Sequence, residues 1–161
     1  MSQSADTLGK RAIARQLSHA EQLCAQRGTR LTPLRRQVLE ALLHHPGSLK
    51  AYELLALLQD SQPGAAPPTV YRALDFLTAQ GLIHRLDAIN AWSACTDAGG
   101  ERHDLLLVCT RCGRVAELND PALGAQLARC IARAGFALAD DESELPEVRA
   151  LCGTCATRPG V

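Results

Sequence analysis

Two Cys-x-x-Cys pairs have the plainest chemistry in this chain. They are Cys109-Thr110-Arg111-Cys112 and Cys152-Gly153-Thr154-Cys155. Each pair holds two thiolates close together on a short turn, and four thiolates complete the tetrahedral shell that zinc prefers. The spacing therefore predicts one structural zinc site, formed by Cys109, Cys112, Cys152 and Cys155.

A thioredoxin-like redox role is the alternative interpretation of a Cys-x-x-Cys pair. Such a motif normally occurs once, near a helix start in a βαβ unit, whereas this chain has two copies on strand-like segments. The 39 residues between the pairs exceed the spacing of a simple zinc ribbon and leave room for a helix and strands. Structural zinc is therefore favoured over redox chemistry.

A second, mixed set of possible metal ligands lies at the ends of predicted strands. It consists of His84, Cys95, His103 and Glu117. Zinc accepts a shell of one thiolate, two imidazoles and one carboxylate. A lone histidine at a strand end is, however, more often exposed or satisfied by a protein partner, and Cys95 also fits a small core position. Spacing alone does not separate these readings.

The helix predicted over residues 69–80 has the third candidate surface. At 100° per residue, Tyr71, Arg72 and Asp75 share the face opposite its apolar stripe, near the N-terminus that begins at Thr69. Recognition helices put such residues on base edges and phosphates, so Arg72 could pair with guanine or a phosphate, and Tyr71 could meet a thymine methyl or a phosphate. The alternative is an ordinary amphipathic surface helix. The helix lies in the basic half of the chain, however, and a predicted hairpin follows it, and both observations favour a DNA-binding role.

Apolar periodicity predicts the elements that must position these residues. In the first half we expect helices over 12–26, from Pro33 to Pro46, over 51–59 and over 69–80, a loop over 60–68, then short strands over 82–86 and 91–94. In the second half we expect strands over 103–109, 114–118 and 148–151, a further one over 136–138, and a helix over 121–134. Its Leu123, Leu127 and Ile131 are expected to face inward. The fold class is α+β: an N-terminal winged helix-turn-helix followed by a small α/β domain.

The charge distribution also divides the chain. Residues 1–85 hold ten Lys/Arg against six Asp/Glu, and residues 86–161 hold seven against eleven, although the net charge is zero. We therefore expect a winged-helix domain over 1–90, a hinge over 91–100 and a zinc-binding α/β domain over 101–161. A polyanion such as DNA would meet the first domain.

Several classes of function are not expected. The polar N-terminus and the lack of a long apolar run argue against a signal peptide and a membrane span, so we expect a cytoplasmic protein. Seven cysteines in a reducing compartment favour metal ligation over disulfides. A zinc-dependent hydrolase would need an open metal position and a general base, and no His-Glu-x-x-His signature is present. We expect neither an enzyme nor a small-molecule substrate; a thiol redox sensor is a further alternative.

Three segments resemble the ferric-uptake-regulator family, and its zinc-sensing branch most closely. They are Cys24-Ala25-Gln26-Arg27-Gly28-Thr29-Arg30-Leu31-Thr32-Pro33, Pro67-Pro68-Thr69-Val70-Tyr71-Arg72-Ala73-Leu74-Asp75-Phe76-Leu77, and Cys109-x-x-Cys112-Gly113. The iron-sensing branch has a histidine-rich stretch before the first cysteine pair, where this chain has only His103-Asp104-Leu105-Leu106. A thiolate at Cys95 favours zinc over iron or manganese.

The resemblance implies a homodimeric, zinc-responsive transcriptional repressor with a C-terminal dimerisation domain and two Zn²⁺ sites per subunit. Cys109, Cys112, Cys152 and Cys155 match the structural site, and His84, Cys95, His103 and Glu117 match the sensing site at the hinge. Thr69, Tyr71 and Arg72 match the family's DNA-contacting helix, and Tyr52 matches a tyrosine near DNA in the preceding helix. Zinc at the hinge is expected to favour a dimer that binds palindromic operators of zinc-uptake genes.

Overall fold

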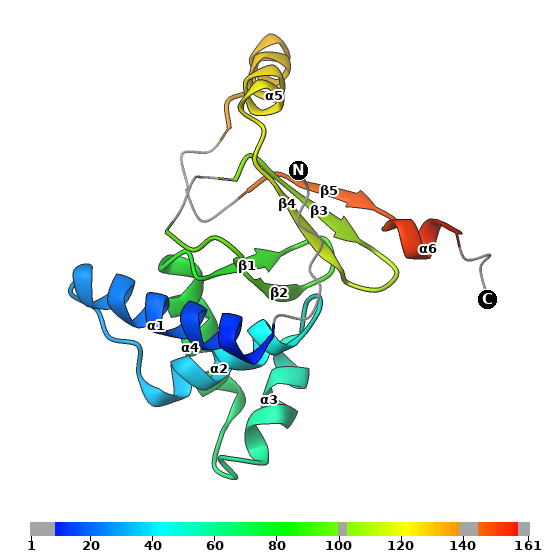
Figure 1. Ribbon diagram of the computed structural model, residues 1–161. Coiled ribbons are helices and arrows are strands. Elements are labelled where there is room, and N and C mark those ends of the chain that lie inside the picture. The colour runs from blue at the N-terminus through cyan, green and yellow to red at the C-terminus, as the bar shows by residue number, and fades with distance from the viewer. Residues whose placement is uncertain (1–8, 100–102, 139–144, 158–161) are drawn as a thin grey trace.

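The computed structural model describes residues 9–99, 103–138 and 145–157. Four helices come first: α1 (Lys10–Gln26), α2 (Pro33–His44), α3 (Ala51–Gln59) and α4 (Pro67–Ala79). A hairpin of β1 (Ile83–Leu86) and β2 (Ala91–Ala94) follows. The remaining elements are β3 (Leu105–Cys109), β4 (Val115–Leu118), α5 (Pro121–Arg133), β5 (Glu147–Ala150) and α6 (Gly153–Thr157). Figure 1 shows the four helices packed together on one side of the hairpin and the second sheet on the other.

The four helices and the hairpin share one hydrophobic core. The apolar stripe of α1 (Ile13, Leu17, Ala20 and Cys24) is buried, and so are Leu54 of α3 and Leu74 and Leu77 of α4. β1 and β2 pair antiparallel, and Trp92 of β2 exchanges two backbone hydrogen bonds of 2.9 Å with Leu49, just before α3. The hairpin is thereby held against the helices, which is the expected winged-helix arrangement.

Helix α4 begins two residues earlier than the sequence predicts. Its first residues are Pro67 and Pro68, where the expected loop was to end. Proline is tolerated in the first turn because the backbone N–H it lacks has no helical partner there. The N–H of Thr69 donates to Ala66 O at 2.9 Å, so Thr69 still lies in the first turn.

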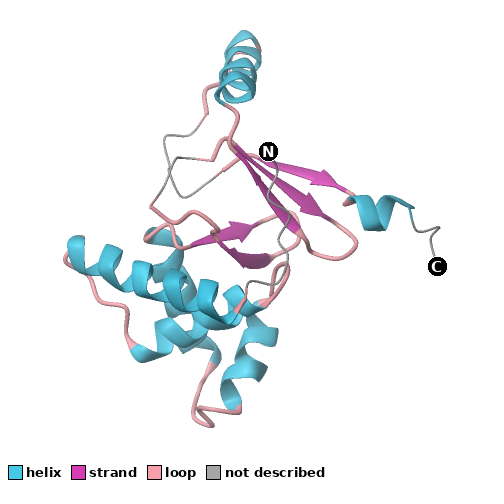
Figure 2. Ribbon diagram, in the orientation of Figure 1, coloured by secondary structure: helices cyan, strands magenta, loops and turns pink. Residues whose placement is uncertain are grey.

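The second half is a three-stranded sheet in the order β4-β3-β5 (Figure 2). β3 pairs antiparallel with β4 and parallel with β5, and α5 lies in the connection between β4 and β5. Leu106, Val108 and Val115 of the sheet form a small core with Leu86, which belongs to the hairpin. The two halves therefore share an apolar contact.

Polar contacts also join the two halves. The backbone N–H groups of Asp87 and Ala88, at the hairpin turn, donate to the Glu147 carboxylate of β5 at 2.8 and 3.0 Å. On the other side, Ser48 Oγ, between α2 and α3, donates to Gly113 O at 2.9 Å. Gly113 has φ +71° in the turn of the first cysteine pair, a conformation that favours glycine. Each end of the second sheet thus touches the winged-helix half.

Helix α5 differs from its expectation. Leu123, Leu127 and Ile131 were predicted to face inward, but none of the α5 residues is buried and Leu123 is 40% exposed. Figure 1 shows α5 standing away from the sheet. Periodicity correctly marks an apolar face, but it does not say what covers that face. Within this chain the expected packing is wrong.

The strand expected over 136–138 is also not formed. The N–H of Phe136 donates to Ile131 O at 3.1 Å and Gly135 has φ +83°, so these two residues form the C-terminal cap of α5. Of the cysteines outside the paired motifs, Cys130 of α5 is exposed, whereas Cys24 of α1 is buried in the first core.

The pairing of β2 with β1 bears on the domain boundary. The predicted hinge over 91–100 begins inside β2, whose Trp92 is buried in the first core, so residues 91–94 lie with the winged-helix half. Cys95 and Ala98, further along the predicted hinge, are buried in the same core. Every described helix is too short or too polar to cross a lipid bilayer.

Candidate metal centres and nucleic-acid interface

The four paired cysteines come together at one end of the second sheet. The first pair lies at the β3–β4 turn and the second at the start of α6, and all four sulfur atoms lie within 4.8 Å of one another. We call this group, Cys109, Cys112, Cys152 and Cys155, the four-cysteine cluster. The sulfurs of Cys112 and Cys152 are 3.7 Å apart. Arg111 Nη1 donates to Cys155 O at 2.5 Å, a further link between the two segments.

The pKa of each thiol in this cluster depends on its neighbours. Burial opposes ionisation of Cys109, but backbone N–H groups of Cys152, Cys112 and Arg111 outweigh it and lower its pKa to about 6. Burial and the neighbouring thiols, Cys152 first, raise the pKa of Cys155 to about 12. Four negative sulfurs at this spacing cannot coexist without a cation. The donor set therefore fits a thiolate-bound metal such as zinc.

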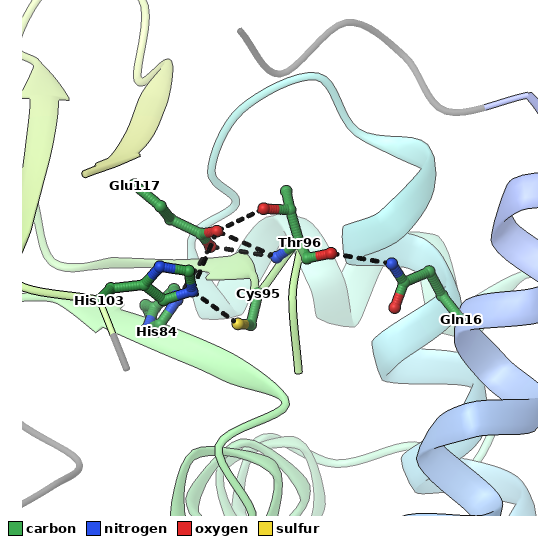
Figure 3. Close-up of polar contacts among 6 residues, drawn as sticks. All are labelled: Gln16, His84, Cys95, Thr96, His103 and Glu117. Atoms are coloured by element: carbon green, nitrogen blue, oxygen red, sulfur yellow. Dashed lines mark hydrogen bonds and ion pairs between the residues drawn. The ribbon is translucent and has the colours of Figure 1, made fainter. Parts of the chain in front are cut away.

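A second cluster lies between the two halves. His84 comes from β1, Cys95 follows β2, His103 precedes β3 and Glu117 lies in β4; one ligand atom of each is within 4.8 Å of the others. We call these residues the mixed cluster (Figure 3). Two ligands come from the hairpin side and two from the sheet side. A metal held by all four would connect the two halves.

Short polar contacts join the side chains of the mixed cluster. Glu117 Oε1 is 2.9 Å from His84 Nε2, and Glu117 Oε2 is 3.3 Å from His103 Nε2. Cys95 Sγ is 3.5 Å from His103 Nε2. All four side chains are largely buried, so an ion there would be shielded from water.

Burial acts differently on the two acidic members of the mixed cluster. Burial, and then the negative charge of Glu117, raises the pKa of the Cys95 thiol to about 12. Burial also works against ionisation of Glu117, but the hydrogen bond and charge of His84, with the Thr96 hydrogen bond, hold its pKa below the usual value. A carboxylate and a protonated thiol face the same two imidazoles. Zinc fits this donor set because it binds nitrogen, sulfur and oxygen ligands alike and displaces the thiol proton.

Thr96 completes the surroundings of Glu117. Its backbone N–H lies 3.1 and 3.3 Å from the two carboxylate oxygens, and its hydroxyl donates to Glu117 Oε2. Its carbonyl accepts a 2.9 Å hydrogen bond from Gln16 Nε2 of α1. Neither residue is singled out by sequence pattern. Adjacency of Thr96 to Cys95 is the one signal that could have indicated it.

The candidate DNA-contacting residues lie on the winged-helix half. Tyr52 of α3 is 66% exposed and Tyr71 of α4 is 47% exposed. Arg72 is exposed and Thr69 is half-buried in the first turn of α4. The Tyr71 ring packs edge-on against Trp92 of the hairpin, with centroids 6.0 Å apart. Tyr71 and Arg72 of α4, predicted to face outward, are therefore exposed to solvent, and the Tyr71 ring contacts the hairpin.

Comparison with known proteins identifies the class. The chain combines a winged helix with a small α/β sheet. One cluster of possible metal ligands lies at the junction of the two parts, and the other lies at the end of the sheet. The model of the ferric uptake regulator family matches residues 26–145, and the chain belongs to this family. It is 39% identical over 140 residues to the zinc uptake regulation protein of Escherichia coli (strain K12), an alignment that covers 86% of this chain and 80% of that protein. It is 35% identical over 104 residues to the ferric uptake regulation protein of Legionella pneumophila, covering 65% of this chain and 74% of that one.

Solved structures resemble the chain to different degrees. A zinc uptake regulator complexed with zinc and DNA matches with a TM-score of 0.78 at 38% identity, covering 89% of this chain and 95% of that one. The holo form of XcZur matches with 0.73 over 88% and 97% of the two chains, and its apo form with 0.53 over 91% and 99%, both at 38% identity. At equal identity, the chain therefore superposes more closely on the holo form than on the apo form.

Proposed function

We propose that this protein is a zinc-responsive, DNA-binding transcriptional repressor that acts as a homodimer. The observation that carries the proposal is the mixed cluster, which draws His84 and Cys95 from one half and His103 and Glu117 from the other. Its relatives include a zinc uptake regulation protein and a zinc uptake regulator complexed with zinc and DNA. Operators of zinc-uptake genes are the proposed targets.

The mechanism is a linkage between metal binding and domain arrangement. Zinc at the mixed cluster would hold the hairpin against the second sheet, and with it the orientation of α4. In a dimer, two α4 helices could then meet half-sites about 34–36 Å apart on a palindrome. A metal that binds this domain arrangement more tightly than the alternative arrangements shifts the population towards it. The affinity for DNA then rises by the coupling free energy between the metal site and the DNA-binding surface.

The two clusters would hold zinc for different purposes. Two neutral imidazoles, one thiolate and one carboxylate balance the charge of Zn²⁺, which suits reversible binding at the mixed cluster. Four thiolates leave a net charge of −2, and this softer, all-sulfur shell suits permanent structural zinc. Zinc binding as such is well supported by the donor sets; two sites per subunit is the proposal.

A gel-shift titration tests the function. Palindromic DNA is titrated with the protein at buffered free zinc, iron or manganese. Zinc is expected to increase the DNA affinity at the lowest free concentration, because Cys95 is a soft ligand. DNA binding that is independent of all three metals would contradict the proposal.

Arg72→Ala is expected to weaken operator binding by about 1–3 kcal/mol, roughly 5- to 150-fold. Arg72 is exposed near the start of α4, where recognition helices meet base edges and phosphates. Its loss removes one charge-assisted contact without touching either metal cluster. Fluorescence anisotropy at saturating zinc gives the Kd.

The variant Arg72→Lys distinguishes the two contacts that Arg72 could make. Lysine retains the charge but not the planar fork, so it should rescue a phosphate contact and fail to rescue a guanine contact. Zinc content and oligomeric state should be those of wild type in both variants. Wild-type operator affinity in Arg72→Ala would remove this residue from the DNA interface.

The uncovered face of α5 is the proposed dimer surface. Leu123 and the half-buried Leu127 and Ile131 form one stripe, and Phe136 and Leu138 beyond the helix are 73% and 45% exposed. Exposed apolar patches of this kind mark interaction surfaces. A second copy of the same half would bury them.

Introducing charges on this stripe is expected to break the dimer. Leu127→Glu with Ile131→Glu removes apolar burial of about 1.5–3 kcal/mol per side chain, which weakens the dimer by at least about 100-fold. Ala125→Glu, on the opposite face of α5, is the matched control and should remain dimeric. Sedimentation across a concentration series reads out both. A double variant as dimeric as the control would exclude this face.

A further inference from the structure

The carboxylate of Glu117 accepts hydrogen bonds from Thr96, which lies outside the mixed cluster, as well as contacting the two histidines of the cluster. Thr96 places two donors on it, the backbone N–H at 3.1 and 3.3 Å and the side-chain hydroxyl on Oε2. The same oxygens lie beside His84 Nε2 at 2.9 Å and His103 Nε2 at 3.3 Å. Figure 3 shows the carboxylate between Thr96 on one side and the imidazoles on the other. Its orientation is thus fixed from the side away from the two imidazoles.

Thr96 is itself anchored from a third direction. Its carbonyl accepts a hydrogen bond of 2.9 Å from Gln16 Nε2, on the helix α1 of the winged-helix half. Thr96 also follows Cys95 directly, so one peptide unit carries one ligand and positions another. Gln16, Thr96 and Glu117 therefore form a continuous path from α1 to β4.

Fixing a carboxylate affects what the site binds. Groups that hydrogen-bond to metal ligands keep them in the binding orientation, and their loss typically costs 10–100-fold in metal affinity. A carboxylate offers two oxygens and about four lone-pair positions. Because Thr96 donates to some of these lone-pair positions, the Glu117 carboxylate has fewer accessible orientations before a metal binds. Less conformational entropy is therefore lost on binding.

From this geometry we infer that Thr96 is a positioning residue, which orients Glu117 and thereby sets the metal affinity of the mixed cluster. The inference rests on the proposed function, in which the mixed cluster holds zinc. The hydroxyl of Thr96 is its removable part, since the backbone N–H stays in any substitution. Thr96→Val removes the hydroxyl and keeps the shape, whereas Thr96→Ser keeps the hydroxyl.

The test is a zinc competition titration of the full-length protein with zinc already at its four-cysteine cluster. Thr96→Val is expected to lower the affinity for the next zinc equivalent roughly 10- to 100-fold, and Thr96→Ser to remain within about threefold of wild type. Thr29→Val is the matched control, because it removes a hydroxyl that donates to Cys24 O at 3.1 Å and whose hydrogen-bond partners lie outside the mixed cluster. Co²⁺ absorption at the same site gives a second readout, because a reoriented carboxylate changes the ligand-field bands.

A double-mutant cycle separates positioning from general stability. In a Glu117→Ala background, Thr96→Val should cost no further zinc affinity, because the group it acts through is gone. An equal loss in both backgrounds, or an equal loss for Thr96→Ser and Thr96→Val, would overturn the inference. Wild-type affinity and cobalt bands in Thr96→Val would overturn it too.

Failure of the inference differs from failure of the proposed function. His84→Ala and Cys95→Ser should both weaken the second zinc equivalent if the mixed cluster binds it. If these two variants bind like wild type, the cluster assignment itself is wrong. If they lose affinity and Thr96→Val does not, only the role of Thr96 is wrong.

Discussion

Cys95→Ser is expected to abolish zinc-dependent operator binding and to leave a folded dimer with zinc at its four-cysteine cluster. Cys95 supplies the one soft, anionic sulfur of the mixed cluster. A serine hydroxyl does not ionise in its place, so the site keeps two neutral imidazoles and one carboxylate. Even the loss of an outer partner of a ligand costs 10–100-fold in metal affinity, and loss of a ligand should cost more than about 100-fold.

Gel shifts at buffered free zinc measure this effect, with zinc content and sedimentation on the same samples. Cys24→Ser is the matched control, since Cys24 is an equally buried thiol that belongs to neither cluster. It should retain the zinc dependence of wild type. A Cys95→Ser variant with unchanged zinc dependence would show that sensing takes place elsewhere.

Cys109→Ser or Cys152→Ser is expected to unfold the second half or to dissociate the dimer. That half has a small core, to which the sheet contributes Leu106, Val108 and Val115, and its strand β5 exposes Val148. The four-cysteine cluster ties the β3–β4 turn to α6 near the end of the chain. Structural zinc contributes about 10–16 kcal/mol, as much as the whole stability of a typical domain, so losing a ligand outweighs the remaining packing.

Circular dichroism, zinc analysis and sedimentation read out the second prediction. Cys130→Ser replaces an exposed cysteine outside both clusters and should leave the circular dichroism and the zinc content unchanged. Removal of zinc by a strong chelator should reproduce the effect of Cys109→Ser in the wild type. Variants that stay folded, dimeric and zinc-loaded would remove the structural role from this cluster.

Much of the fold could be predicted from local pattern. Helix α3 and strand β2 have the predicted bounds, and α1, α2, α4 and α5 begin or end within two residues of theirs. These helices carry strong apolar periodicity, and all of them except α3 are followed within two residues by a glycine or proline, which acts locally on the backbone. The sequence pattern was insufficient where packing decides. Leu123, Leu127 and Ile131 share an apolar face as predicted, yet none of the residues that the structure describes buries it.

The two clusters differ in how visible they are along the chain. The four-cysteine cluster is visible in the sequence as two Cys-x-x-Cys motifs, because two cysteines separated by two residues can bind one ion from a single turn. His84 and Glu117 are 33 residues apart and come from different sheets, so their meeting depends on how the hairpin packs on the second sheet. Spacing left that set unresolved, and the family resemblance pointed to it.

By itself, the sequence determined the order of the elements, the paired cysteines and the outward side chains of α4, because these follow from neighbours along the backbone. Only the tertiary structure decided that His84, Cys95, His103 and Glu117 lie within reach of one ion, and that Thr96 holds Glu117 in place. These contacts form when Leu86 of the hairpin packs into the core of the second sheet and the Glu147 carboxylate accepts the N–H groups of the hairpin turn. Such long-range packing is a property of the folded whole, and local pattern does not encode it.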